Sequence, residues 1–273
     1  MSFIVLTGAS SGIGSAAAIE LTRRGHQVLA VGRTQSKLDS LLSKMQTAAG
    51  PDVSPPTPIQ CDFSAMNNVR KLADHIRENY NSIDVLVNNA GVQPIKHIVT
   101  EDGFELAWAV NHMAPFLLTN LVIDRIQTSG GRVVTTSSSN HKTGEIDFSN
   151  LSMDRDYSSA NAYDRTKLAN ILFTGELSRR TQIPATSFHP GTISTDLNRD
   201  VRFIRLIKPF ERILMSPTYK GADTLTWLAT SPEGARPSSH YYYKRTPTPV
   251  AEAALDRALA NQLWEDSADR LRL

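Results

Sequence analysis

The chain has 273 residues, of which 40% are hydrophobic and 21% are charged, so it can bury a core of ordinary size. The formal net charge of +2 is too small to indicate a nucleic acid or an anionic membrane as a partner. A single cysteine, Cys61, excludes an internal disulfide and a cysteine-rich metal site.

Signals for export, membrane insertion and metal binding are not found in the sequence. The N-terminal residues lack the pattern of a secretion signal, and no stretch approaches the roughly 20 apolar residues of a membrane span. The seven histidines show no ligand spacing with carboxylates. We therefore expect a cytoplasmic protein with no membrane span and no metal site.

Short β-rich runs alternate with longer amphipathic segments along the chain. Strands are expected at 3–6, 27–31, 58–61, 84–87, 132–136, 185–188 and 240–243. Helices are expected at 13–24, 34–45, 69–80, 104–127 with a kink at Pro115, 160–180 and 219–229, and after Thr248 and Pro249 at the C-terminal end. This alternation predicts an α/β fold, a doubly wound parallel sheet of the Rossmann type with helices on both faces. No linker divides the chain, so residues 1–273 are expected to form one domain.

The first predicted strand runs directly into a glycine-rich turn that opens the first predicted helix. In Thr7-Gly-Ala-Ser-Ser-Gly-Ile-Gly14 the glycines follow the spacing G-x-x-x-G-x-G. Small residues let the backbone approach a pyrophosphate, and a helix N-terminus offers free N–H groups and a favourable dipole. A purely structural turn is the alternative, and the position after the first strand weighs against it. The expected phosphate-binding residues are Gly8, Ser10, Ser11, Gly12, Ile13 and Gly14.

The end of the second predicted strand indicates which dinucleotide is bound. NAD-binding folds place an acidic residue there to bind the ribose 2′-hydroxyl. This chain has Gly32 and Arg33 instead, and a guanidinium suits a 2′-phosphate. The sequence therefore favours NADP(H), with a solvated surface arginine as the alternative reading of Arg33.

Tyr163 and Lys167 lie four positions apart in a predicted helix, so they share one face of it. A neighbouring cation favours the phenolate, which predicts that Lys167 lowers the pKa of Tyr163 from about 10 toward about 7. A tyrosine tuned in this way can donate or accept a proton at working pH. The spacing alone is common on exposed helix faces, so its meaning depends on the other motifs.

Taken together, the motifs resemble those of the short-chain dehydrogenase/reductase family over nearly the whole chain. In order they are the glycine turn, Asp62, Asn88-Asn-Ala-Gly91, Asn111, Ser138, Tyr163 with Lys167, and Pro190-Gly191. A narrower resemblance is to the retinol dehydrogenase-like and WW-domain oxidoreductase-like branch. It is carried by residues 163–173, His189-Pro-Gly191 with Thr195, Lys244-Arg-Thr246 and Leu263-Trp264.

The resemblance implies hydride transfer at a nicotinamide and four catalytic residues. Tyr163 would be the general acid for carbonyl reduction and the base for alcohol oxidation, and Lys167 would also bond the nicotinamide ribose. Ser138 would donate to the carbonyl oxygen, where negative charge develops. Asn111 would hold a water that links Lys167 to solvent. Of the adjacent serines the family pattern selects Ser138, and the alternation of a strand turns Ser137 away.

The resemblance also implies further contacts to the cofactor. Asp62 would contact the adenine with Phe63 beside it, although Asp62 could instead cap the following helix. The adenosine ribose would be lined by Asn89, Ala90 and Gly91, whose plainer reading is a tight turn. The nicotinamide would be covered by Pro190, Gly191, Thr192, Ile193 and Thr195. His112 is expected to pack, and His189 is expected to anchor the end of its strand. His141, which could touch substrate, is expected to be a solvated loop residue.

These observations predict an oxidoreductase that transfers a hydride between NADP(H) and a carbonyl or alcohol. Alternatives are an NADPH-dependent C=C reductase and a catalytically silent NADP-binding regulator, and the intact catalytic residues speak against the silent regulator. Apolar residues in a predicted substrate lid around 195–218 indicate an apolar or aromatic substrate, with Gln93, Asn140 and Tyr157 nearby. Family members often pair through two long helices, but the retinol dehydrogenase-like branch is less uniform, so the resemblance suggests a homodimer and leaves the oligomeric state open.

Overall fold

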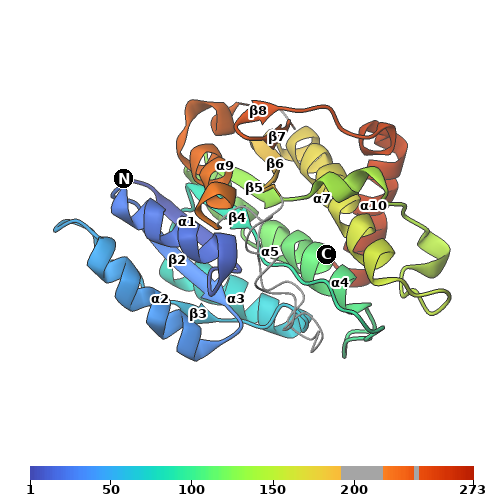
Figure 1. Ribbon diagram of the computed structural model, residues 1–273, viewed down its shortest axis with the longest axis horizontal. Helices are drawn as coiled ribbons and strands as arrows, with labels where there is room; N and C mark the ends of the chain where they lie inside the picture. The colour runs from blue at the N-terminus through green and yellow to red at the C-terminus, as the bar shows by residue number, and fades with distance from the viewer. Residues whose placement is uncertain (192–217, 237–239) are drawn as a thin grey trace, which may run out of the picture.

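The computed structural model describes residues 1–191, 218–236 and 240–273. Within these residues, eight strands form one sheet in the order β3-β2-β1-β4-β5-β6-β7-β8 (Figure 1). The strands are β1 (Phe3–Thr7), β2 (Gln27–Gly32), β3 (Ile59–Gln60), β4 (Val85–Asn88), β5 (Arg132–Thr136), β6 (Ala185–His189), β7 (Tyr241–Tyr243) and β8 (Thr246–Pro247). Neighbours are parallel except β7 and β8, which pair antiparallel. The predicted doubly wound α/β sheet is confirmed, and the antiparallel edge strand β8 was not predicted.

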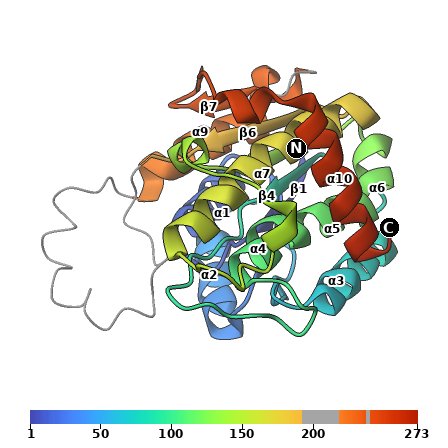
Figure 2. The ribbon, with the colours of Figure 1, turned by 90° about the vertical axis from the view of Figure 1, so that its right-hand side faces the viewer.

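Helices cover both faces of the sheet (Figures 1 and 2). One face packs against α1 (Gly12–Arg23), α2 (Gln35–Ala48) and α9 (Thr218–Thr230). The other packs against α3 (Met66–Asn79), α5 (Ala114–Leu121), α7 (Ser159–Thr181) and α10 (Arg257–Leu271). A hydrophobic core lies on each face, and strand β1 contributes to both. Ile4 and Leu6 pack in the core on the α1 side, and Val5 packs in the core on the α7 side. Successive side chains of a strand point to opposite faces, so a strand buried on both faces is apolar throughout.

The helix predicted over 104–127 is divided. It consists of α4 (Leu106–Trp108), a π-helical turn η1 (Ala109–Met113), α5 and α6 (Ile123–Thr128), with a break at Val122. Pro115 lies in the first turn of α5, directly after the π-helical turn. Proline has no N–H to donate to the carbonyl four residues earlier, so regular α-helical bonding cannot continue through it. The irregular turn carries Asn111.

The C-terminal helix begins later than predicted. Helix α10 starts at Arg257, where the Asp256 carboxylate accepts from Ala258 N at 2.8 Å and Leu259 N at 3.0 Å. Thr248 and Pro249 do not open it, so that prediction is wrong. The Thr248 N–H instead donates to the Tyr241 carbonyl, which keeps this segment beside β7. A short 3₁₀ turn, η7 (Glu252–Leu255), joins it to α10.

Helix α10 packs on α7 and α5, which correspond to the long helices expected at 160–180 and 104–127. The Trp264 ring lies 4.9 Å from Phe116 and 5.9 Å from Phe173, measured between centroids. The Arg180 guanidinium of α7 donates to the Glu265 carboxylate of α10 at 2.6 Å. Pairing through α5 and α7 would therefore have to include or displace α10.

The described residues contain neither a membrane-spanning helix nor a metal-binding cluster. No helix there combines the length and the apolar composition that crossing a membrane requires. No group of three or more His, Cys, Asp or Glu side chains there is arranged to hold a metal ion.

Candidate active site

A pocket of about 250 Å³ lies at the carboxyl ends of the strands. Strand β1 is bonded to β2 on one side and to β4 on the other, so the strand order reverses beside it. Open α/β sheets bind ligands at such a switch point. The predicted residues that line the pocket are Gly8, Ser10, Ser11, Gly12, Ile13, Gly14, Arg33, Asp62, Phe63, Asn89, Ala90, Gly91, Tyr163, Lys167 and Pro190.

The glycine turn is built for close approach of main chain to main chain. Gly8 has φ +66°, and a Cβ on it would lie 2.7 Å from Ala90 Cα. A Cβ on Gly14 would lie 2.3 Å from the Gly8 carbonyl oxygen. Ser11, the N-cap of α1, makes no capping bond with its side chain, so the first N–H groups of the helix are left for another acceptor. This turn fits a pyrophosphate.

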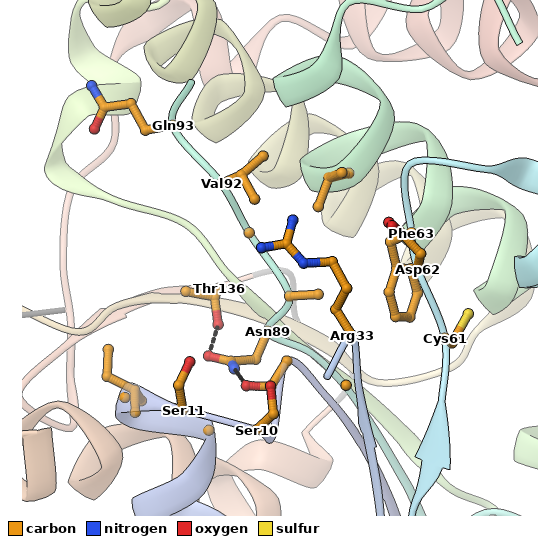
Figure 3. Close-up of a pocket in the computed structure, with 18 of the residues that line it drawn as sticks. Ser10, Ser11, Arg33, Cys61, Asp62, Phe63, Asn89, Val92, Gln93 and Thr136 are labelled. Atoms are coloured by element: carbon orange, nitrogen blue, oxygen red, sulfur yellow. Dashed lines mark hydrogen bonds between the residues drawn. The ribbon is translucent and has the colours of Figure 1, made fainter. Parts of the chain in front are cut away.

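Asn89 ties the turn to the neighbouring strands. Its Nδ2 donates to the Thr7 carbonyl at 3.1 Å. Its Oδ1 accepts from Thr136 Oγ1 at 3.2 Å, the bond drawn between these two residues in Figure 3. The Thr7 hydroxyl in turn accepts from the N–H groups of Asn89 and Ala90 at 2.9 and 3.1 Å. These bonds join the ends of β1, β4 and β5 into one rigid floor.

The end of β2 leaves no room for a side chain before Arg33. A Cβ on Gly32 would lie 2.8 Å from Ser10 Cβ, so an acidic residue there would displace the glycine turn. The exposed Arg33 side chain extends into the pocket, across from Asp62 and Phe63 (Figure 3). Asp62 Oδ1 accepts from the Ser64 N–H at 3.0 Å and hydroxyl at 2.8 Å. Helix α3 is capped by Asp102, which accepts from Met66 N at 2.8 Å, rather than by Asp62.

Tyr163 and Lys167 share the pocket face of α7, with Lys167 Nζ 4.9 Å from the centre of the Tyr163 ring. Burial raises the pKa of Tyr163 to about 12, and the Ser138 hydroxyl lowers it only in part. The predicted drop of this pKa toward 7 is wrong for this geometry, because loss of solvent outweighs the hydrogen bond from Ser138 and the Asp164 carboxylate also raises the pKa. Burial also lowers the pKa of Lys167 to about 8. At neutral pH the phenol therefore holds its proton and the ammonium keeps most of its charge.

Ser138 lies beside the pocket at the start of the 3₁₀ turn η2 (Ser139–Lys142). Its hydroxyl donates to Asn140 Oδ1 and accepts from Asn140 N, both at 3.3 Å. Asn140 Nδ2 donates to the buried Asp164 carboxylate at 2.7 Å. Ser137 points into α7 and donates to the Lys167 carbonyl at 2.8 Å, so it faces away from the pocket as predicted.

Asn111 is held by three hydrogen bonds. Its Oδ1 accepts from Val92 N at 2.8 Å, and its Nδ2 donates to the Val92 carbonyl at 2.9 Å and to Thr166 Oγ1 at 3.1 Å. A Cβ on Gly91 would lie 3.4 Å from Asn111 Oδ1 and 3.8 Å from Lys167 Nζ. Asn111 therefore joins the segment after β4 to α7, close to the ammonium.

A buried ion pair that the sequence did not reveal lies behind the Tyr–Lys pair. Arg165 Nη2 donates to Glu105 Oε2 at 3.0 Å, with both side chains almost fully buried. Glu105 also accepts from Ala107 N and Trp108 N at 2.8 and 2.9 Å. The pair locks α7 to α4 and the turn of Asn111. Its only sequence signal was a charged residue between Tyr163 and Lys167.

Some predicted residues do not line the pocket. Ser138 and Asn111 stand behind its wall, and Gly191 follows Pro190 outside it. Thr192, Ile193, Thr195 and nearly all of the predicted lid lie outside the described residues. Pocket residues that were not assigned to the cofactor are Gly32, Thr34, Cys61, Val92, Gln93, Pro94, Leu106, Val110 and Thr136. Most contribute small or apolar surface, which carries no distinctive sequence signal.

The predictions for the three histidines had different outcomes. His112 is fully buried and its Nε2 bonds Ser267 Oγ at 3.0 Å, so it packs as predicted. The His189 ring stacks on Tyr243 at 5.1 Å, a contact with the neighbouring strand β7 that agrees with the expected anchor at the end of β6. His141 is 0% exposed, so the prediction of a solvated loop residue is wrong. The 3₁₀ turn after β5 folds its side chain inward between β7 and the segment before η7.

The fold and pocket define a nucleotide-binding oxidoreductase of the α/β class. The chain belongs to the short-chain dehydrogenase family, whose model, described as short chain dehydrogenase, matches residues 2–203. It is 39% identical over 267 residues to DnrU of Streptomyces sp. (strain C5), provisionally named a daunorubicin C-13 ketoreductase, covering 97% of this chain and 91% of that protein. It is 34% identical to Retinol dehydrogenase 14 of Homo sapiens, covering 97% of this chain and 84% of the relative. A crystal structure of an uncharacterized protein from Mycobacterium Paratuberculosis superposes with a TM-score of 0.80 at 31% identity, covering 100% and 94% of the two chains.

Proposed function

We propose that this chain is an NADP(H)-dependent reductase of apolar or aromatic carbonyl compounds, and that it oxidises the corresponding alcohols in reverse. The observation that carries the proposal is that one pocket joins a phosphate-binding turn, Arg33 and the Tyr163–Lys167 pair. The named relatives are a provisionally named daunorubicin C-13 ketoreductase and Retinol dehydrogenase 14, whose names describe reactions between a carbonyl and an alcohol.

The preference for NADP(H) rests on two features at the end of β2. The contact between Gly32 and Ser10 excludes the acidic side chain that binds a ribose 2′-hydroxyl. Arg33 is exposed and lines the pocket, so its guanidinium can bind a 2′-phosphate there. The glycine turn and the N-terminus of α1 would hold the pyrophosphate. A bound nicotinamide supplies the hydride.

Side chains of this chain would donate the proton and stabilise the negative charge that develops on the substrate oxygen. Tyr163 holds its proton at neutral pH and would give it to the carbonyl oxygen during reduction. Ser138 would turn its hydroxyl from Asn140 to that oxygen and stabilise the developing charge. Lys167 would bind the nicotinamide ribose and place a positive charge beside the phenol. Asn111 would hold the segment after β4 in place and support proton supply to Lys167.

NADPH consumption with a panel of aromatic and aliphatic ketones and aldehydes tests the proposal. Tyr163→Phe should lower kcat by about 10²- to 10⁴-fold while NADPH still binds, because only the acid is removed. Undiminished turnover in that variant would overturn the assigned mechanism. NADPH-dependent loss of an enone's C=C bond with the carbonyl retained would favour the C=C reductase. NADPH binding without turnover of any substrate would favour the silent regulator.

The cofactor preference has its own experiment. Affinities for NADPH and NADH should differ strongly in the wild type, and Arg33→Ala should weaken NADPH about 10- to 100-fold with little change for NADH, since a charge-assisted bond contributes about 1.5–3 kcal/mol. The matched control is Arg236→Ala, because Arg236 is also an exposed arginine but does not line the pocket. An unchanged NADPH preference in Arg33→Ala would refute the assignment of Arg33 to the 2′-phosphate.

A further inference from the structure

His141 is a fully buried polar residue that the reaction scheme above does not use. It lies three residues after Ser138 in η2. Its ring meets Tyr241 of β7 edge to face, with centroids 4.9 Å apart. A buried imidazole is costly unless its polar atoms are bonded, so its partners indicate why it is there.

Both ring nitrogens of His141 have partners. Nδ1 lies 2.7 Å from the Ser138 carbonyl oxygen, and Nε2 lies 3.2 Å from the Ala251 backbone nitrogen. The Ala251 N–H can only donate and the Ser138 carbonyl can only accept. The ring must therefore be neutral, with its proton on Nδ1 and its lone pair on Nε2. Burial lowers the pKa of His141, and Lys142 acts in the same direction, which agrees with a neutral ring.

The Ser138 carbonyl receives two bonds from the same residue, one from His141 Nδ1 and one from the His141 backbone N–H at 3.2 Å. Together they fix the orientation of the peptide that follows Ser138. They therefore hold the Ser138 Cα and the direction of its Cα–Cβ bond in place, while the hydroxyl can still turn about that bond toward a ligand. The bond from Ala251 holds the far side of the ring, so the segment before η7 helps to set this orientation.

We propose that His141 is a positioning residue, which orients Ser138 from behind and couples it to the C-terminal segment at Ala251. This inference rests on the proposed reductase function, because it assigns His141 a role through Ser138. Displacing a catalytic group by about 1 Å can lower a rate about 100-fold. The effect of losing His141 should therefore appear in kcat and depend on the Ser138 hydroxyl.

A double-mutant cycle tests this dependence. His141→Leu should lower kcat about 10- to 100-fold with the KM for NADPH nearly unchanged. In a Ser138→Ala background the same change should have almost no further effect on kcat, because the hydroxyl it orients is already absent. An equal loss in both backgrounds, or a loss confined to KM, would overturn the proposal. His112→Leu is the matched control, since it removes another buried histidine and should lower stability without any dependence on Ser138.

Ala251→Pro tests the coupling with the ring intact. Ala251 has φ −63°, which proline adopts without strain, so the change removes mainly the N–H that bonds His141 Nε2. We expect a fall in kcat smaller than that of His141→Leu, and no further fall when both changes are combined. Additive effects would show that Ala251 acts independently of the ring and would refute the coupling.

Nitrogen NMR of ¹⁵N-histidine-labelled protein gives a readout that does not need turnover. His141, assigned by the loss of its signals in His141→Leu, should show the neutral form with the proton on Nδ1 at pH 7. A ring protonated on Nε2 at that pH would overturn the positioning role. If the wild type reduces no carbonyl but His141 has the expected form, the proposed function fails while the assigned geometry stands.

Discussion

The two walls of the pocket are built in different ways. The β1 wall, formed by residues 8–14, Gly32 and Asn89–Gly91, consists mainly of backbone brought close by glycine. The β5–α7 wall is lined by Thr136, Tyr163 and Lys167. Residues 137–141 and 164–166 lie behind these three and are joined by buried hydrogen bonds and one ion pair. A backbone wall suits a ligand whose phosphates accept from N–H groups. A side-chain wall suits chemistry, because only side chains hold protons that can be given up.

The first prediction concerns the ion pair that supports the β5–α7 wall. Glu105→Gln leaves the Arg165 guanidinium buried without its counter-charge, so the free energy of unfolding should fall by about 4 kcal/mol. Urea unfolding measures this change. The matched control is Glu265→Gln, which breaks a pair whose carboxylate is 62% exposed and should cost less than about 1 kcal/mol. Equal losses in the two variants would show that burial does not distinguish the pairs.

The second prediction is that the buried charge of Lys167 lowers the free energy of unfolding, although the proposed reaction requires this residue. Burial lowers its pKa from 10.5 to about 8, so charging it in the fold costs about 3 kcal/mol at neutral pH. Lys167→Met should abolish reduction and raise the free energy of unfolding by about that amount at pH 7.

The pH dependence of that gain provides the control. Between pH 8 and 10.5 the folded wild type loses the Lys167 proton while the unfolded chain keeps it, so wild-type stability should rise and the gain of Lys167→Met should shrink. A gain that stays constant from pH 7 to pH 10 would point to better packing by methionine instead of removal of a buried charge.

The contrast between the walls also explains what the sequence could predict. Most of the β1 wall comes from one short segment, because Gly8 to Gly14 are close together in the chain. Their spacing therefore predicts the conformation of the turn without any long-range contact. The apolar runs of β1, β4 and β5 likewise predicted the sheet. In the β5–α7 wall only residues within one turn of each other, such as Tyr163 and Lys167, could be paired from spacing.

Long-range contacts account for what was missed. His141 is buried because Ala251, 110 positions later, supplies an N–H to its ring, and no local pattern reports that contact. Glu105 and Arg165 are 60 positions apart, so neither could be recognised as half of an ion pair. The pKa of Tyr163 was predicted from one neighbour, whereas burial by the whole fold determines its direction.

A third prediction tests whether the β1 wall acts through its backbone. A Cβ at residue 14 would lie 2.3 Å from the Gly8 carbonyl oxygen, and a backbone atom cannot rotate away. Gly14→Ala should therefore weaken NADPH binding about 100-fold, or by about 3 kcal/mol, measured by NADPH fluorescence titration. Gly50→Ala is the control, because a Cβ there meets nothing within 4 Å. Full NADPH affinity in Gly14→Ala would mean that the turn does not approach the pyrophosphate.

The smallest expected effect is a pH dependence that belongs to the β5–α7 wall alone. Burial holds the pKa of Lys167 at about 8, and that of Tyr163 at about 12. As pH rises above about 8, Lys167 loses its charge while Tyr163 keeps its proton, so kcat/KM for carbonyl reduction should fall about tenfold per pH unit. In Lys167→Arg the guanidinium stays charged, so any remaining activity should lose this alkaline decline. A decline that persists unchanged in Lys167→Arg would assign the titration to Tyr163, and would show that its phenol ionises far more readily than its burial implies.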